Sequence, residues 1–259
     1  DVNRIRERQN RLTANNLIIG SSLGINYNSQ ESILDESFFQ LQGKLNLVGS
    51  LLNQILKSSG ADKNELGQYE IDGVAPSQHI KTELNFIKHW QTSVNSVLAF
   101  RAFGGIAIPF GNAQSIPFSR SYFSGGSNDN RAWRAYRLGP GSSNNLNEFN
   151  EANFKLSFNL EYRFPIVRKI KGALFIDAGN IWNVLDDVDD PAFRFDGLKD
   201  LNEIAVGTGF GLRYDFNFFV FRLDTGFKTH NPALSKSLGW GGDYSIKSAV
   251  FNIGINYPF

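Results

Sequence analysis

One arginine and two carboxylates stand out, because the alternation of polar and apolar residues around the carboxylates would let all three side chains meet. Arg131 lies in a long glycine-rich segment, and Glu161 and Asp177 lie in the two alternating segments that follow it. Alternation places both carboxylates on the same side of neighbouring strands, within reach of a returning loop. A guanidinium donates in a fork that fits carboxylates, and such bonds are worth roughly 1.5–3 kcal/mol where water is partly excluded. In open water the same pair would be worth under about 1 kcal/mol.

Other groupings give little support for catalysis or metal binding. The chain contains no cysteine, which excludes disulfides and thiolate chemistry. His79 and His89 share a face, but ten residues of strand separate them by roughly 33 Å. The acidic run Asp186, Asp187, Asp189 and Asp190 lacks the spacing of an EF-hand. We therefore predict no enzyme, no catalytic residue, no metal site and no cofactor.

Glycines 207, 209 and 211 do not form a nucleotide loop, because no Gly-Lys-Ser/Thr follows them. Spaced by two in a strand pattern, they are predicted to face one side of a wall and to leave room for something to pack there. The net charge of +1 gives no general attraction for nucleic acid. Nucleic acid is therefore not expected as a partner.

Alternation with a period of two dominates the chain. In 153–164 six apolar residues alternate with six polar ones, which is typical of a strand with one apolar and one polar face. Strands of this kind can cross a membrane with about 9–11 residues, so the mean hydropathy of −0.26 does not exclude membrane insertion. Nine strands are predicted, at 15–28, 38–49, 79–90, 96–109, 153–164, 170–182, 203–216, 218–229 and 248–259.

The lengths of the predicted connections alternate strictly. Short turns are expected near 29–35, 91–95, 165–169 and Asn217, and long loops near 52–77, 110–151, 183–202 and 229–247. Bacterial outer-membrane barrels have short periplasmic turns opposite long extracellular loops. The sequence therefore predicts an all-β, antiparallel transmembrane β-barrel in the bacterial outer membrane, in preference to a soluble β-sandwich.

The loop sequence 116–142 carries a family resemblance. It holds Gly125-Gly126, then Arg131-Ala132-Trp133, then Leu138-Gly139-Pro140-Gly141. This resembles the loop that folds back into the barrel in the BamA/TamA family of outer-membrane assembly factors, most closely the TamA-like proteins of Bacteroidetes. The family motif is hydrophobic-Arg-Gly-aromatic, so Asn130 and Ala132 depart from it. Glu161, Asp177 and the C-terminal Phe259 match the family's acidic residues and terminal aromatic.

The resemblance implies a sixteen-stranded barrel whose final nine strands are present here. Residues 1–259 would then be the C-terminal part of one barrel domain, with earlier strands and periplasmic POTRA domains outside this sequence. The implied function is insertion of proteins into the outer membrane through a weak seam beside the last strand. Gly254 and Pro258 should weaken pairing of that strand, because Gly packs no side chain and Pro cannot donate to a ladder.

The partners implied are unfolded outer-membrane or secreted client proteins, the lipid bilayer, and possible accessory periplasmic or lipoprotein subunits. Two alternatives remain open from the sequence. A two-partner secretion transporter carries a related arginine loop, and a plain porin would need no arginine-carboxylate contact.

Overall fold

A computed structural model describes residues 15–32, 35–64, 67–111, 113, 115–143, 150–185 and 190–259. Nine strands form one antiparallel sheet in which each strand pairs with its neighbours in the chain. The predicted all-β class is confirmed, and every predicted strand is present, with bounds that differ from the predicted ones by up to five residues. The strands are β1 Gly20–Asn28, β2 Phe39–Val48, β3 His79–Ser93, β4 Ser96–Pro109, β5 Phe154–Val167, β6 Ile170–Trp182, β7 Ala205–Asp215, β8 Val220–His230 and β9 Val250–Ile255.

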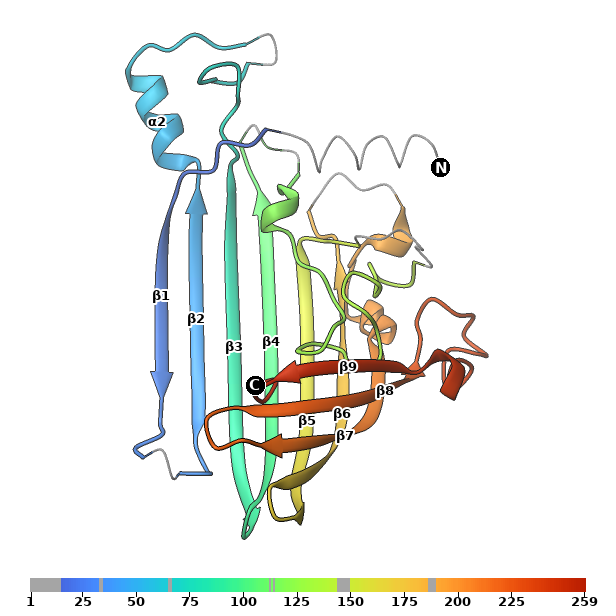
Figure 1. Ribbon diagram of the computed structural model, residues 1–259. Coiled ribbons are helices and arrows are strands. Elements are labelled where there is room, and N and C mark those ends of the chain that lie inside the picture. The colour runs from blue at the N-terminus through green and yellow to red at the C-terminus, as the bar shows by residue number, and fades with distance from the viewer. Residues whose placement is uncertain are drawn as a thin grey trace.

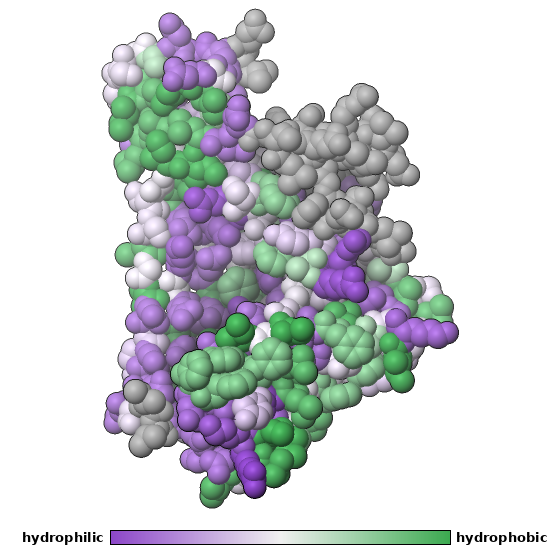
Figure 2. Space-filling view, viewed as in Figure 1, coloured by the Kyte–Doolittle hydropathy of each residue, from purple (hydrophilic) through white to green (hydrophobic). Residues whose placement is uncertain are grey.

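Alternation along each strand separates two faces of different chemistry. On β5, Leu160 and Tyr162 are 37% exposed, whereas Glu161 between them is fully buried. This is opposite to a soluble sheet, where the apolar face would be the covered one. An exposed apolar face and an inward polar face are expected of a wall that stands in lipid. Hydrophilic side chains gather over the middle of β2 and β3 on the side that Figure 2 displays.

The sheet curls strongly at its C-terminal end. β7, β8 and β9 pass in front of β5 and β6, and the chain between β4 and β5 lies in the space between these two parts (Figure 1). The curl makes one side of the sheet concave. Among the described residues β1 and β9 form the two edges of the sheet.

The connections alternate in length as predicted. Those after β1, β3, β5 and β7 are short, and those after β2, β4, β6 and β8 are long. The described parts of the long ones contain a helix that the sequence analysis did not foresee, α2 Ser50–Ser58, and four 3-10 turns: η1 Phe118–Arg120, η2 Pro191–Phe193, η3 Leu198–Glu203 and η4 Ile246–Ser248. No helix in the described part of the chain has the length and apolarity needed to cross a membrane. Of the acidic run, Asp186, Asp187 and Asp189 lie outside the described residues.

The last strand differs from the expectation of a strand over 248–259. β9 ends at Ile255, and Asn256 has a positive φ of 62°, which ends the extended conformation there. Pro258 therefore lies outside the strand and removes no donor from its ladder, which corrects the prediction made for it. The Asn256 side chain accepts from Val220 N at 3.3 Å and its own N–H donates to Val220 O, so this turn closes on the start of β8.

The two-faced wall predicts unequal effects of adding charge. Leu45→Arg on the outward face of β2 should lower the free energy of unfolding by about 2–4 kcal/mol if the site is near the bilayer midplane. Gln42→Arg lies on the inward face of the same strand and should cost much less. Urea unfolding in lipid vesicles measures both variants. Equal losses would show that the outward face of β2 does not contact lipid.

Candidate functional site

The loop between β4 and β5 makes a tight turn just before Arg131. Gly125 and Gly126 have φ angles of 93° and 104°, and a Cβ on Gly125 would lie 2.3 Å from Arg134 O. Only glycine fits a left-handed position with the backbone that close. Asp129 closes the turn by accepting from Gly125 N at 2.7 Å and from Ser124 Oγ at 2.9 Å. The turn thus places Arg131 at the tip of the loop.

Asp129 remains ionised although it is covered. Burial by itself would raise its pKa, but the nearby Lys155 ammonium and hydrogen bonds from Ser124 and Gly125 outweigh burial and hold the pKa below its ordinary value. Ser157 Oγ also donates to the carboxylate, at 2.9 Å. The turn is therefore attached to the inward face of β5 by charge as well as by shape.

Arg131 contacts both predicted carboxylates. Its Nε and Nη2 donate to Asp177 at 2.8 and 2.9 Å, and its backbone N–H donates to the same carboxylate at 3.0 Å. Nη1 donates to Glu161 Oε2. All three side chains are at most 1% exposed, so water does not screen the contact. The buried arginine and the buried carboxylates therefore each need a partner of opposite charge. The guanidinium also lies 3.5 Å from the centre of the Phe175 ring.

Burial by itself would lower the pKa of Arg131. Asp177, Glu161 and Asp224 outweigh burial and hold the pKa above its ordinary value, so the guanidinium stays charged. We refer to the contact of Arg131 with Glu161 and Asp177 as the latch.

The charged cluster is larger than the sequence analysis foresaw. Glu161 also accepts from Arg163 Nε at 2.9 Å and from Arg213 Nη2 at 3.1 Å. Asp224 on β8 pairs with Arg213 and Arg222 and lies 3.8 Å from Arg131. Four guanidiniums therefore surround three carboxylates. Inward charges at alternating positions of β5, β7 and β8 were the signal that could have predicted these partners.

This cluster changes the expected role of each carboxylate. Glu161 has two arginine partners besides Arg131. Asp177 pairs with Arg131 and otherwise accepts from the neutral amide of Asn159, at 2.9 Å. Loss of Arg131 would therefore leave Asp177, rather than Glu161, poorly compensated.

Small residues on β7 and β8 make room for the loop. A Cβ on Gly207 would lie 2.6 Å from the Ala132 methyl, and one on Gly226 would lie 2.5 Å from Arg131 O. The glycines at 207, 209 and 211 do face the inner side, as predicted, and the loop occupies the room at Gly207. The sequence analysis did not predict this role for Gly226, although it lies at an inward position of β8 just as Gly207 does on β7. Next to this seat, Trp133 packs in a buried cluster with Ala132, Leu138 and Ala205.

The returning half of the loop lies against β6. Gly141 N donates to Ile181 O at 2.8 Å, and Asn180 Nδ2 donates to Gly141 O at 2.8 Å. A Cβ on Gly139 would lie 2.3 Å from Asn180 Oδ1. The predicted loop glycines therefore have two roles: Gly125 and Gly126 let the loop fold back on its own backbone, and Gly139 and Gly141 bring it close to β6.

The edge strand β9 contacts the loop directly. Asn252 Nδ2 donates to Arg131 O at 2.9 Å. Gly254 lies opposite Arg222, and a Cβ there would be 2.3 Å from Arg222 Nε. The glycine therefore leaves space for a buried arginine of the cluster, a role that the sequence analysis did not assign. Beyond the strand, Phe259 O accepts from Arg163 Nη2 at 3.1 Å, so the C-terminal residues also reach the cluster.

The Omp85 superfamily domain matches residues 19–259, which include every strand and the loop. The chain belongs to the Omp85 superfamily. Members of this superfamily reside in the bacterial outer membrane and serve protein insertion or translocation there, so an outer-membrane location is established for this chain. The expected relationship to the BamA/TamA proteins is confirmed at the level of the superfamily.

A solved structure has a similar fold. The crystal structure of BamA from Haemophilus ducreyi lacking POTRA domains 1–3 superposes with a TM-score of 0.59 at 14% sequence identity. The match covers 90% of this chain and 41% of that one. At this identity the likeness concerns the fold alone. Comparison with curated proteins gave no match.

The latch of this Omp85 chain predicts a large effect of removing its arginine. Arg131→Ala would leave a buried Asp177 without its charged partner, which should cost about 3–5 kcal/mol. The loop should then leave its seat and be cut faster by proteinase K. Arg134→Ala is the matched control, because Arg134 is in the same loop but exposed. Equal cleavage of both variants would show that the latch does not hold the loop.

The close packing of the loop on Gly226 can be tested separately from the ion pairs. Gly226→Ala would press a methyl group on the backbone of Arg131 and Ala132, and overpacking of this kind costs about 1–3 kcal/mol. Gly43→Ala on β2 meets nothing within 4 Å and serves as the control. Thermal unfolding in detergent compares the two. A Gly226→Ala protein as stable as the control would contradict close seating of the loop.

Proposed function

We propose that this chain works in insertion or translocation of other proteins at the outer membrane, through a lateral seam at β9. The observation that carries the proposal is the hydrogen bond from Asn252 of β9 to the backbone of Arg131. It joins the edge strand to the loop whose arginine is held by the strands opposite. A passive pore has no need for such a connection.

The physics of the proposed seam is strand addition. β9 has six residues, whereas β8 beside it has eleven. Its outer edge has no strand partner among the described residues. In lipid each unmet backbone group costs several kcal/mol, so β9, once separated from the strand that closes the barrel, would favour pairing with an incoming strand. A client strand could thus pair with β9 before it enters the bilayer.

The latch would support this edge from inside. Buried ion pairs hold the loop on β5 and β6, and the loop in turn contacts Gly226 of β8 and Asn252 of β9. Movement of β9 therefore requires loss of a loop contact, which restrains the edge when no client is bound. We propose that Arg131, Glu161 and Asp177 hold the loop as the latch and that Trp133 supports it by packing beside it. We propose Gly254 and Phe259 as residues that shape the seam.

The proposed process forms no covalent bond and uses no cofactor. Its partners would be unfolded outer-membrane or secreted proteins and the bilayer, with periplasmic or lipoprotein subunits as possible helpers. A two-partner secretion pore is the second candidate, because its substrate would pass through the lumen past the same loop. The two functions differ in whether the seam must open.

A disulfide across the seam distinguishes the two functions. The chain has no cysteine of its own, so Ile253→Cys can be paired with a cysteine on the strand that closes the barrel against β9. The oxidised protein should fail to insert client barrels and should recover on reduction, while conductance through the lumen stays unchanged. Each single-cysteine variant is the control.

Client insertion by the locked protein would mean that the seam does not open, and would favour the pore. Loss of conductance on locking would instead show that the bond distorts the barrel. In that case a second pair, two residues along β9 at Phe251, repeats the test.

A further inference from the structure

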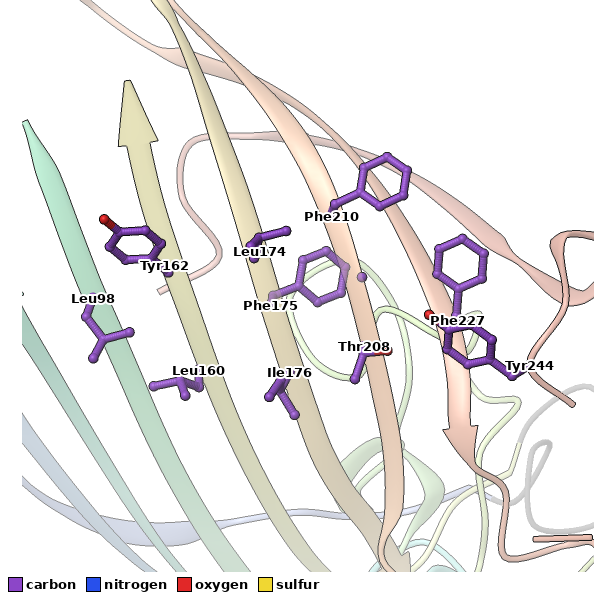
Figure 3. Close-up of a pocket in the computed structure, with 11 residues that line it drawn as sticks. Leu98, Leu160, Tyr162, Leu174, Phe175, Ile176, Thr208, Phe210, Phe227 and Tyr244 are labelled. Carbon is purple, nitrogen blue, oxygen red and sulfur yellow. The ribbon is translucent and has the colours of Figure 1, made fainter. Parts of the chain in front are cut away.

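The outward face of the wall has a hollow behind the latch. It has a volume of about 520 Å³ and lies over β5, β6, β7 and β8. Figure 3 shows Leu174 and Ile176 on β6, Phe210 on β7 and Phe227 on β8 around it. Leu174, Ile176 and Phe210 are 55%, 48% and 54% exposed, so these side chains do not fill the hollow.

Gly209 and Phe175 form the floor of this hollow. They are opposite each other on β7 and β6, and a Cβ on Gly209 would lie 2.3 Å from the end of the Phe175 ring. Phe175 belongs to the inward face, and its ring lies over Gly209, where a side chain is absent. The guanidinium of Arg131 lies 3.5 Å from the centre of this ring, so Phe175 is a neighbour both of the hollow and of Arg131.

A row of aromatic rings makes one side of the hollow. Phe210 and Phe227 have ring centres 6.2 Å apart, and Phe227 and Tyr244 have centres 5.2 Å apart. Tyr244 comes from the connection between β8 and β9, which thus reaches over the outer face. Aromatic side chains supply a large apolar contact area at a low cost in conformational entropy, so this row forms a rigid apolar surface.

The chemistry of the hollow fits a hydrocarbon chain. None of the described residues that line it carries a charge. The Thr208 hydroxyl already pairs with that of Thr229 at 2.8 Å. A headgroup phosphate would find no cation here, so recognition has to be of an apolar chain. The volume is within the range of about 300–1,000 Å³ that is usual for small-molecule sites.

Apolarity alone would not select one lipid position over another, because lipid tails are as apolar as Leu side chains. A concave surface differs from a flat or convex wall, since it contacts a chain on several sides and gains dispersion energy from each. The outer-membrane location of the superfamily places phospholipid against this face. We propose that the hollow is a binding site for one acyl chain of a membrane phospholipid, packed on the wall directly behind Arg131.

Lipid photolabelling tests this site, which is independent of the proposed seam. The purified protein is reconstituted in phosphatidylethanolamine vesicles that contain a phospholipid with a diazirine near the middle of one acyl chain. Labelled residues are then located by mass spectrometry. We expect labels to concentrate on residues of the hollow on β6, β7 and β8, well above the outward residues of β2 and β3.

Filling the hollow should remove the label. Leu174→Trp and, as a second variant, Ile176→Trp should lower labelling there severalfold. Leu84→Trp is the matched control, because Leu84 on β3 is 54% exposed on the same outward side. Heat-modifiability on gels identifies variants that have folded, and only those are compared.

Three results would overturn the proposal. Uniform labelling of all outward strands would mean ordinary lipid contact only. Labelling that both tryptophan variants leave unchanged would place the chain elsewhere. A hollow without label in the otherwise labelled protein would mean that something other than phospholipid covers it.

Discussion

The buried guanidinium of Arg131 is the interaction on which the rest of the site depends. A charge that is 1% exposed can persist only with partners of opposite sign, and the two carboxylates that bind it come from β5 and β6. Once it is bound there, the backbone of the same residue is placed against β8 and β9. One residue thus connects, through the loop, strands from both ends of the curled half of the sheet. The tight turn at Gly125, the carboxylate of Asp129 and the absent side chains at Gly207 and Gly226 all serve to let the loop reach this position.

The charge cluster shows why a polar interior can be rigid in this protein. A soluble domain is held together by apolar side chains in its centre, but the apolar side chains here face outward, toward lipid. The inner face compensates with ion pairs: Arg213 of β7 pairs with Glu161 of β5 and with Asp224 of β8, and Arg222 pairs with Asp224 along β8. These pairs are buried because the loop covers them. The loop and the cluster therefore stabilise one another, and loss of either should expose the other to water.

The same arrangement brings three environments close together. Phe175 lines the lipid-facing hollow, and its ring is in contact with the latch arginine. Asn252 connects the loop to the edge of the sheet. A change in β9, in the loop or in the lipid at the hollow would therefore affect the other two through direct contacts. This proximity is a physical basis on which insertion of a client could be linked to the state of the loop.

The sequence by itself determined the two-faced strands, their order, the alternation of short and long connections, and the residues of the latch. Each of these depends on local periodicity or on residue type, because a period of two sets which side chains share a face. It also placed Gly207 on the inner wall. Only the tertiary structure decided that Arg163, Arg213, Arg222 and Asp224 join the cluster, since their distances depend on how strongly the sheet curls. Likewise, the turn at Asn256 ends β9 before Pro258, and the roles of Gly226 and Gly254 come from close approach of segments far apart in the chain. Contacts of that kind follow from packing in three dimensions, which periodicity along one strand does not encode.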